Sequence, residues 1–267
     1  MGTAGQHIAL DGKSLTGAFE SGERATPLHL VTAWAVDQRL VLAQRHAPGR
    51  SEVTAALDVV ALLDLQATTV TADALHASRK MATAIRQRGG DYALALKGNR
   101  GPLYHETTAL LATAEPTTSE ASDKAAHGRH EQRQAVVLPV PPDWPLRFKF
   151  DGLAAVARID AVRRIGPTQQ RLSRYFVLSR LLSAPEVLRI VRGHWGIENQ
   201  QHWMLDVVFH EDRARTRKDH GAQNLALLRR LALNLLQADI YKASIRRKIK
   251  RAGWQDAYLF SLLSQMR

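Results

Sequence analysis

The order of strand-like and helical segments in the first hundred residues constrains the fold more than any other feature of the sequence. Seven segments follow one another: strands at 7–15, 29–36 and 40–46, a helix at 51–65, a strand at 68–72, a helix at 76–88 and a strand at 92–97. A helix between two strands of one sheet makes those strands parallel, with a right-handed connection. We therefore expect an α/β fold in which helices flank a mixed sheet.

Local signals set the ends of several segments. The first strand delivers Asp11 and is expected to turn at Gly12, and residues 37–39 separate two strands that suit a hairpin. The first three strands would then form an antiparallel meander. Ser51 is a candidate N-cap for the first helix, and the glycines at 89–90 suit the end of the second.

Two aspartates come at the ends of strands in this arrangement. Asp11 follows the apolar part of the first strand, and Asp73 directly follows the strand at 68–72. Parallel strands bring such carboxylates side by side, where they repel each other unless a positive charge lies between them. A magnesium or manganese ion, which prefers oxygen ligands, would relieve that repulsion. Taken singly, Asp11 is more simply interpreted as a turn or strand-end residue, and Asp73 is equally the N-cap of the next helix.

A third carboxylate comes from a later helix. Ser183 and Glu186 form a capping box, so a helix can begin there and run through Glu198. His194, Glu198 and His202 follow one another at four-residue steps and would share one face of that helix. Glu198 is therefore the candidate for the third ligand, in a site that could hold two ions.

Two other interpretations of this helix stay open. The face is also compatible with a partly solvated polar stripe on which Trp195 and Trp203 pack as amphipathic side chains. A zinc hydrolase on His194, Glu198 and His202 is a more distant alternative, because the sequence lacks the H-E-x-x-H motif.

The charge of the chain points to a polyanionic partner. The sequence holds 37 Lys and Arg against 25 Asp and Glu, a net charge of +12, and residues 213–251 contain twelve Lys or Arg against two Asp. Such an excess suits phosphate binding, with a solvated surface as the bland alternative. No segment is long and apolar enough to span a membrane, and the absence of Cys fits a reducing compartment.

Several basic or polar residues are candidates for DNA contacts. In the basic segment at 242–254 these are Arg246, Arg247 and Lys248, with surface solubility as the alternative role. Lys97 and Asn99 follow a strand of the sheet, where they suit phosphates or bases and equally a loop that satisfies its own backbone.

The remaining chain divides the protein into three parts. The expected first part of the core is 1–100, a linker and β-rich insertion occupy 101–182, and the Glu198 helix with a basic helical end occupies 183–267. In the insertion we expect a linker or loop followed by three strands, the last two joined by a turn: 112–126, 129–140, 153–165, 171–181 and the turn Gly166 and Pro167. Two helices are expected from Gly221 onward.

Five segments carry a resemblance to a known family. They are IALDGKSL, VTADALHA, GGDYALALKGN, GRHEQR and RGHWGIENQQHWMLDVVFHED, in this order. The chain resembles the DDE transposases of bacterial insertion sequences of the ISAs type, including the H-repeat-associated proteins. The resemblance implies an RNase H-like fold, a catalytic metal site of Asp11, Asp73 and Glu198 with two Mg²⁺ or Mn²⁺ ions, and DNA as partner. It also implies phosphodiester hydrolysis and strand transfer at element ends, a homodimer that pairs two ends, and a bacterial cytoplasmic location.

The chain departs from the wider transposase pattern at two points. That pattern has Tyr, Arg and Lys around the glutamate, where this chain has Val191, His194 and Leu205, so Arg192, His194 or His202 would take over phosphate contacts. Only a few residues precede the first strand, where similar transposases have a helical region. A metal-dependent nuclease of the same fold and a truncated, inactive DNA-binding remnant are therefore the alternative functions.

Overall fold

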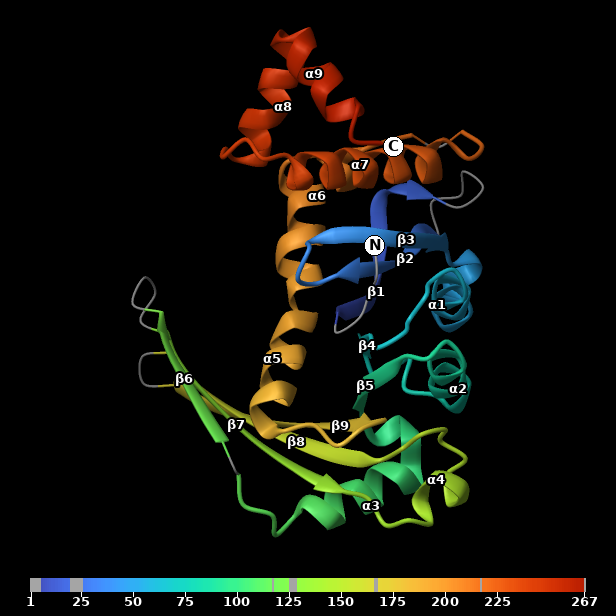
Figure 1. Ribbon diagram of the computed structural model, residues 1–267, viewed down its shortest axis with the longest axis vertical. Helices are drawn as coiled ribbons and strands as arrows, with labels where there is room; N and C mark the ends of the chain where they lie inside the picture. The colour runs from blue at the N-terminus through green and yellow to red at the C-terminus, as the bar shows by residue number, and fades with distance from the viewer. Residues whose placement is uncertain are drawn as a thin grey trace. The chain divides into compact units, whose positions relative to one another are not determined.

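A computed structural model describes residues 6–19, 26–116, 118–124, 129–165, 168–216 and 218–266 (Figure 1). The chain forms two compact units that are both discontinuous in sequence. Residues 1–10 and 63–194 make the first unit, and residues 11–62 and 195–267 make the second. The three-part division expected from the sequence follows other boundaries and stays a prediction.

The first unit contains a mixed sheet in the order β1-β4-β5-β9-β8-β7-β6. Its strands are β1 (His7–Phe19, of which residues 7–10 belong to this unit), β4 (Thr69–Ala72), β5 (Asp91–Leu96), β6 (Thr118–Lys124), β7 (Arg129–Pro139), β8 (Ala155–Ile165) and β9 (Thr168–Leu178). β4 pairs in parallel with both β1 and β5, which places Leu10, Ala72 and Leu94 in one row. The remaining pairs are antiparallel, and the expected parallel strand-helix-strand core is confirmed.

Helices cover the sheet of the first unit. They are α2 (Arg79–Gln87), α3 (Gly101–Leu111), α4 (Trp144–Arg147) and α5 (Ala184–His194), with a short 3-10 turn η3 (Gly98–Arg100) before α3. The buried face of α5 contributes Val187, Leu188 and Ile190 to a cluster with alanines of β8 and with Phe176 and Leu178 of β9. β4 is buried at every position, as expected for a parallel strand covered on both faces.

The second unit contains the rest of β1 with β2 (Pro27–Ala35) and β3 (Leu40–His46), in the order β1-β2-β3. Its helical elements are η2 (Pro48–Arg50), α1 (Glu52–Ala61), the π-helix η5 (Ile197–His202), α6 (Trp203–Val207), η6 (Glu211–Arg213), α7 (Gly221–Ala238), α8 (Ile245–Trp254) and α9 (Asp256–Leu263). β2 and β3 form the expected antiparallel hairpin. Asn234 of α7 joins the helix to β3, because its side chain accepts from the Val41 N–H and donates to the Val41 carbonyl, each at 2.8 Å.

Four expectations about these elements were wrong. β1 continues as a strand through Gly12, and residues 118–124 of the supposed linker form β6. The C-terminal part holds a third helix, α9, beyond the two expected. α1 ends at Ala61, and Ser51 precedes it without a side-chain capping bond, because its hydroxyl bonds to Thr54 at 3.1 Å.

Other expectations are confirmed. The capping box forms, since the Ser183 N–H and hydroxyl both donate to Glu186, at 2.8 and 2.6 Å. β8 and β9 pair as a hairpin, although Gly166 and Pro167 themselves lie outside the described residues. None of the helices in the described part of the chain has the length and apolar character to cross a membrane.

Gly12 should tolerate no side chain, because an added Cβ would lie 2.5 Å from Nε2 of His29 and 2.6 Å from Cδ of Glu52. We expect Gly12→Ala to destabilise the protein by about 1–3 kcal/mol through overpacking. Gly253→Ala is the matched control: its added Cβ meets nothing within 4 Å, and alanine favours a helix. Urea unfolding of both variants measures the difference, and equal stabilities would contradict the packing around Gly12.

Candidate functional site

Asp73 stands where the first unit's buried sheet meets solvent. It directly follows β4, and its side chain is 62% exposed. It does not cap α2, because Ser78 takes that position and accepts a hydrogen bond from Met81 N at 3.2 Å. The alternative role of Asp73 as the N-cap of the next helix is therefore excluded.

A histidine lies beside Asp73. Nε2 of His194 is 3.8 Å from the carboxylate, and this imidazole lowers the pKa of Asp73 below its usual value, with a smaller contribution from Lys97. His194 is buried at the end of α5. It is thus placed to keep the Asp73 carboxylate ionised. Because it is buried, it differs from the exposed cations that could contact phosphate.

A buried hydrogen-bond chain fixes His194 in turn. The Thr71 hydroxyl lies 3.0 Å from Nδ1 of His194 and 2.7 Å from Nε2 of His7. Burial, together with the charges of His194 and Arg189, lowers the pKa of His7 to about 3, so His7 is neutral at physiological pH. His7 and Thr71 were not among the site residues predicted from the sequence. The two-residue period of a strand would have placed them on the same faces as Asp11 and Asp73.

Asp11 has an equivalent neighbour in the second unit. Its carboxylate lies 3.7 Å from Nδ1 of His202, and the two side chains are 16% and 13% exposed. Burial, together with the positive charges of Lys13 and Arg230, lowers the pKa of His202 to about 3. Each of the two expected aspartates is therefore accompanied by one imidazole from the segment around Glu198.

The acidic residues that end this segment serve a buried ion cluster. Lys13 Nζ lies 2.8 Å from Asp206, 3.0 Å from Asp212 and 3.5 Å from Glu211. Glu211 also pairs with Arg230 at 2.6 Å, and both of these side chains are at most 1% exposed. The cluster joins β1, two residues beyond Asp11, to the end of the glutamate-bearing segment. From the sequence, Arg230 was predicted only to be part of the basic C-terminal region.

Glu198 occupies a helix of unusual geometry. α5 ends at His194, and Glu198 lies in the π-helix Ile197–His202, where its side chain is exposed. The expectation of one regular α-helix with His194, Glu198 and His202 on a single face was wrong. π-helical turns inside helices occur frequently at functional sites. The local geometry therefore sets Glu198 apart from an ordinary surface glutamate.

The candidate DNA contacts differ in their surroundings. Lys97, Arg192, Arg246 and Arg247 are exposed. The Asn99 side chain donates to the Ala74 carbonyl at 3.1 Å, so it holds its own loop. Lys248 is buried and donates to the carbonyls of Leu236 and Asp239, at 2.8 Å each, at the end of α7. Its role is structural, and it leaves the set of candidate DNA contacts.

Carboxylate oxygens are the donors that magnesium and manganese prefer, so the three expected ligands fit a hard divalent ion chemically. Asp73 belongs to the first unit, whereas Asp11 and Glu198 belong to the second. Across the residues that the structure describes, no three histidine, aspartate or glutamate side chains form a metal-ligating group.

Comparison with known proteins identifies the family to which this fold and these carboxylates point. Residues 2–235 match the transposase DDE domain family, and the chain belongs to that family. It is 32% identical to "H repeat-associated putative transposase YhhI" of Escherichia coli (strain K12), over 96% of this chain and 71% of that protein. It is equally 32% identical to "Putative transposase YncI" of Escherichia coli O157:H7, over 98% of this chain and 70% of the relative. The family resemblance expected from the sequence is confirmed.

Arg230 should be essential to the stability of the second unit, because its removal leaves Glu211 buried with less compensating charge. We expect Arg230→Met to cost about 3–5 kcal/mol. The neighbouring Arg229, which is half-buried, provides the control, and Arg229→Met should cost less than about 1 kcal/mol. Urea unfolding at pH 7 compares the two variants, and similar losses would contradict the role assigned to the Arg230 pair.

His7 should make folding stability depend on pH. Because its pKa falls from 6.5 to about 3 on folding, the unfolded chain binds more protons between these values, and stability falls as the pH drops below about 6.5. His7→Gln should remove about 2 kcal/mol of the stability difference between pH 7 and pH 5. Urea unfolding at both pH values measures it, with exposed His105→Gln as control. An unchanged pH dependence in His7→Gln would contradict the assignment.

Proposed function

We propose that this protein is a DNA transposase that cuts DNA at the ends of an insertion sequence and joins the freed ends to target DNA. Family membership supports the reaction class. The observation that carries the proposal is the parallel register of β1 and β4: Leu10 pairs with Ala72, and Asp11 and Asp73 are the next residues along these strands. The proposed site unites these aspartates with Glu198.

The proposed site would hold two magnesium or manganese ions through Asp11, Asp73 and Glu198. When bound, such ions activate the attacking oxygen and stabilise the leaving oxygen. His194 and His202 would position the two aspartates, because each imidazole lies within 4 Å of its carboxylate. The low pKa of Asp73 keeps its carboxylate available as a ligand below neutral pH.

The reaction needs no external energy source. In the first step a water oxygen bonds to phosphorus as the bond from phosphorus to the 3′ oxygen breaks, which releases a 3′ hydroxyl. In the second step that hydroxyl oxygen attacks a phosphorus of the target strand, and one target phosphodiester bond is exchanged for a new one. The same carboxylates serve both in-line displacements.

Exposed cations supply the affinity for DNA. Arg246, Arg247, Lys250 and Arg251 line a surface hollow of about 650 Å³ together with Trp254. The guanidinium of Arg251 lies over the rings of Tyr241 and Tyr258, at 4.4 and 4.6 Å, which holds it in place. We propose that this basic surface, with Lys97 and Arg192, contacts phosphates, so binding weakens as salt rises. Two chains, one at each element end, form the assembly that this function favours.

A cleavage and joining assay tests the proposal, on supercoiled DNA with magnesium or manganese and with EDTA. We expect Asp11→Asn, Asp73→Asn and Glu198→Gln each to lose at least about a hundredfold in metal-dependent nicking. His194→Ala should lose roughly ten- to hundredfold, as expected for a residue that orients a ligand.

Asp37→Asn is the matched control, since it removes an exposed carboxylate in the β2–β3 turn. Nicking without joining would favour the metal-dependent nuclease. Salt-sensitive DNA binding without nicking would favour the non-catalytic DNA-binding protein. Nicking that survives all three carboxylate substitutions would contradict the proposed site.

A further inference from the structure

A cavity of about 490 Å³ lies in the first unit, beside the loops that follow β4 and β5. The two loops are joined to each other, because Asn99 donates to the Ala74 carbonyl at 3.1 Å. Ligands of open α/β sheets bind outside the carboxyl ends of parallel strands, which is where this cavity lies. Its volume is in the range of small-molecule sites.

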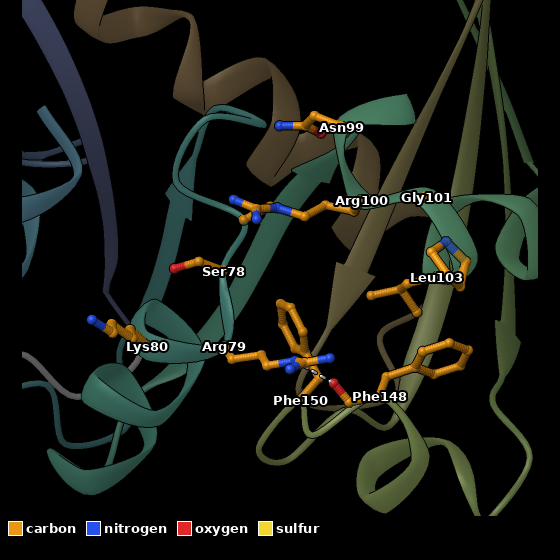
Figure 2. A pocket seen from close by; sticks show the side chains of 11 residues that line it. Ser78, Arg79, Lys80, Asn99, Arg100, Gly101, Leu103, Phe148 and Phe150 are labelled. Carbon is orange, nitrogen blue, oxygen red and sulfur yellow. Dashed lines mark hydrogen bonds between the residues drawn. The ribbon is translucent and has the colours of Figure 1, made fainter.

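The cavity combines an apolar interior with a cationic rim. Its apolar lining is formed by Ala77, Pro102, Leu103, Phe148 and Phe150. Arg79, Lys80 and Arg100 supply three positive charges, and no acidic residue lines it among the described residues. Figure 2 shows Arg100 and Arg79 on opposite sides, with Phe150 and Leu103 between them. An apolar planar group with an anionic substituent would satisfy both parts of this lining.

The two arginines differ in how firmly they are held. Nε of Arg79 donates to the Phe148 carbonyl at 2.8 Å, so Arg79 is part of the wall. Arg100 reaches the Leu75 carbonyl only at 3.4 Å, and its Nε has no hydrogen-bond partner within the part of the chain that the structure describes. The terminal nitrogens of Arg100 are therefore only weakly held, and an oxyanion in the cavity would be a stronger acceptor for them than the Leu75 carbonyl.

We propose that this cavity binds a single nucleotide, with the base against Leu103 and the phenylalanines and the phosphate at Arg100. Stacking on apolar and aromatic walls is tolerant of base identity. Because a paired base is already held in the duplex, the cavity would select an unpaired base over a paired one. The source of the nucleotide rests on the proposed function: it is an unpaired position of the bound DNA. A free nucleotide shares the chemistry and is distinguished below.

Fluorescence anisotropy of the full chain in EDTA tests this, because binding is then measured without cleavage. The probes are a labelled duplex with one unpaired nucleotide and the same duplex fully paired. We expect the unpaired probe to bind about tenfold more tightly, the scale of stacking one base. Arg100→Glu and Leu103→Trp, which fills the cavity, should make the two affinities equal. Lys149→Glu, at an exposed residue that does not line the cavity, should keep the preference.

Circular dichroism establishes that the variants are folded, and Arg100→Glu tests the cavity even where Leu103→Trp fails to fold. Binding of dAMP that both cavity variants abolish, with no preference for the unpaired duplex, would support the nucleotide site with a free nucleotide as its source. Equal duplex affinities with no dAMP binding, or inorganic phosphate binding as tightly as dAMP, would overturn the proposal. Each result is independent of the nicking assay, so the cavity and the proposed function fail separately.

Discussion

The parallel pairing of β4 with β1 and β5 is the constraint on which the rest of the structure depends. Parallel strands require crossover connections, and the helix α2 together with its preceding turn supplies the one between β4 and β5. Because β4 is buried throughout, the chain reaches solvent only at Asp73. The Asp73 carboxylate is exposed yet directly follows a strand that is buried at every position, and metal ligands and catalytic groups are held best on such elements.

The segment around Glu198, residues 192–212, also supplies side chains to buried polar groups. Its first half supplies His194 and His202 beside the two aspartates, and its second half supplies the acids that neutralise Lys13 and Arg230. Removing one partner from such a cluster leaves an uncompensated buried charge, so the members depend on one another. Lys13 of β1 and the pair Glu211 and Asp212 at the end of the segment thus belong to one ion cluster.

The sequence predicted most of the secondary structure because periodicity and capping are local. The hairpin of β2 and β3, the glycine end of α2 and the capping box at Ser183 all follow from neighbouring residues. Gly12 misled because glycine signals a turn, whereas here it allows the close approach of His29 and Glu52. β6 was missed because its polar sequence is held by pairing with β7 at the edge of the sheet.

The candidate site was predictable only in part. Asp11, Asp73 and Glu198 came from strand ends and family resemblance, and their union in one site stays a prediction. His7 and Thr71 escaped because their contact depends on the register between β1 and β4, over 64 residues of sequence. Lys248 misled because charge alone does not show whether a lysine faces solvent or, as here, the end of α7.

Iron-directed backbone cleavage tests most directly whether the three carboxylates share a metal site. Fe²⁺ bound at the site reduces added hydrogen peroxide to hydroxyl radicals, ascorbate returns the Fe³⁺ formed to Fe²⁺, and the radicals cut nearby polypeptide backbone. We predict cuts near Asp11, Asp73 and Glu198 together, suppressed by excess magnesium and lost in Asp73→Asn. Cuts near only one of these residues, or a pattern that Asp73→Asn leaves unchanged, would contradict a shared site.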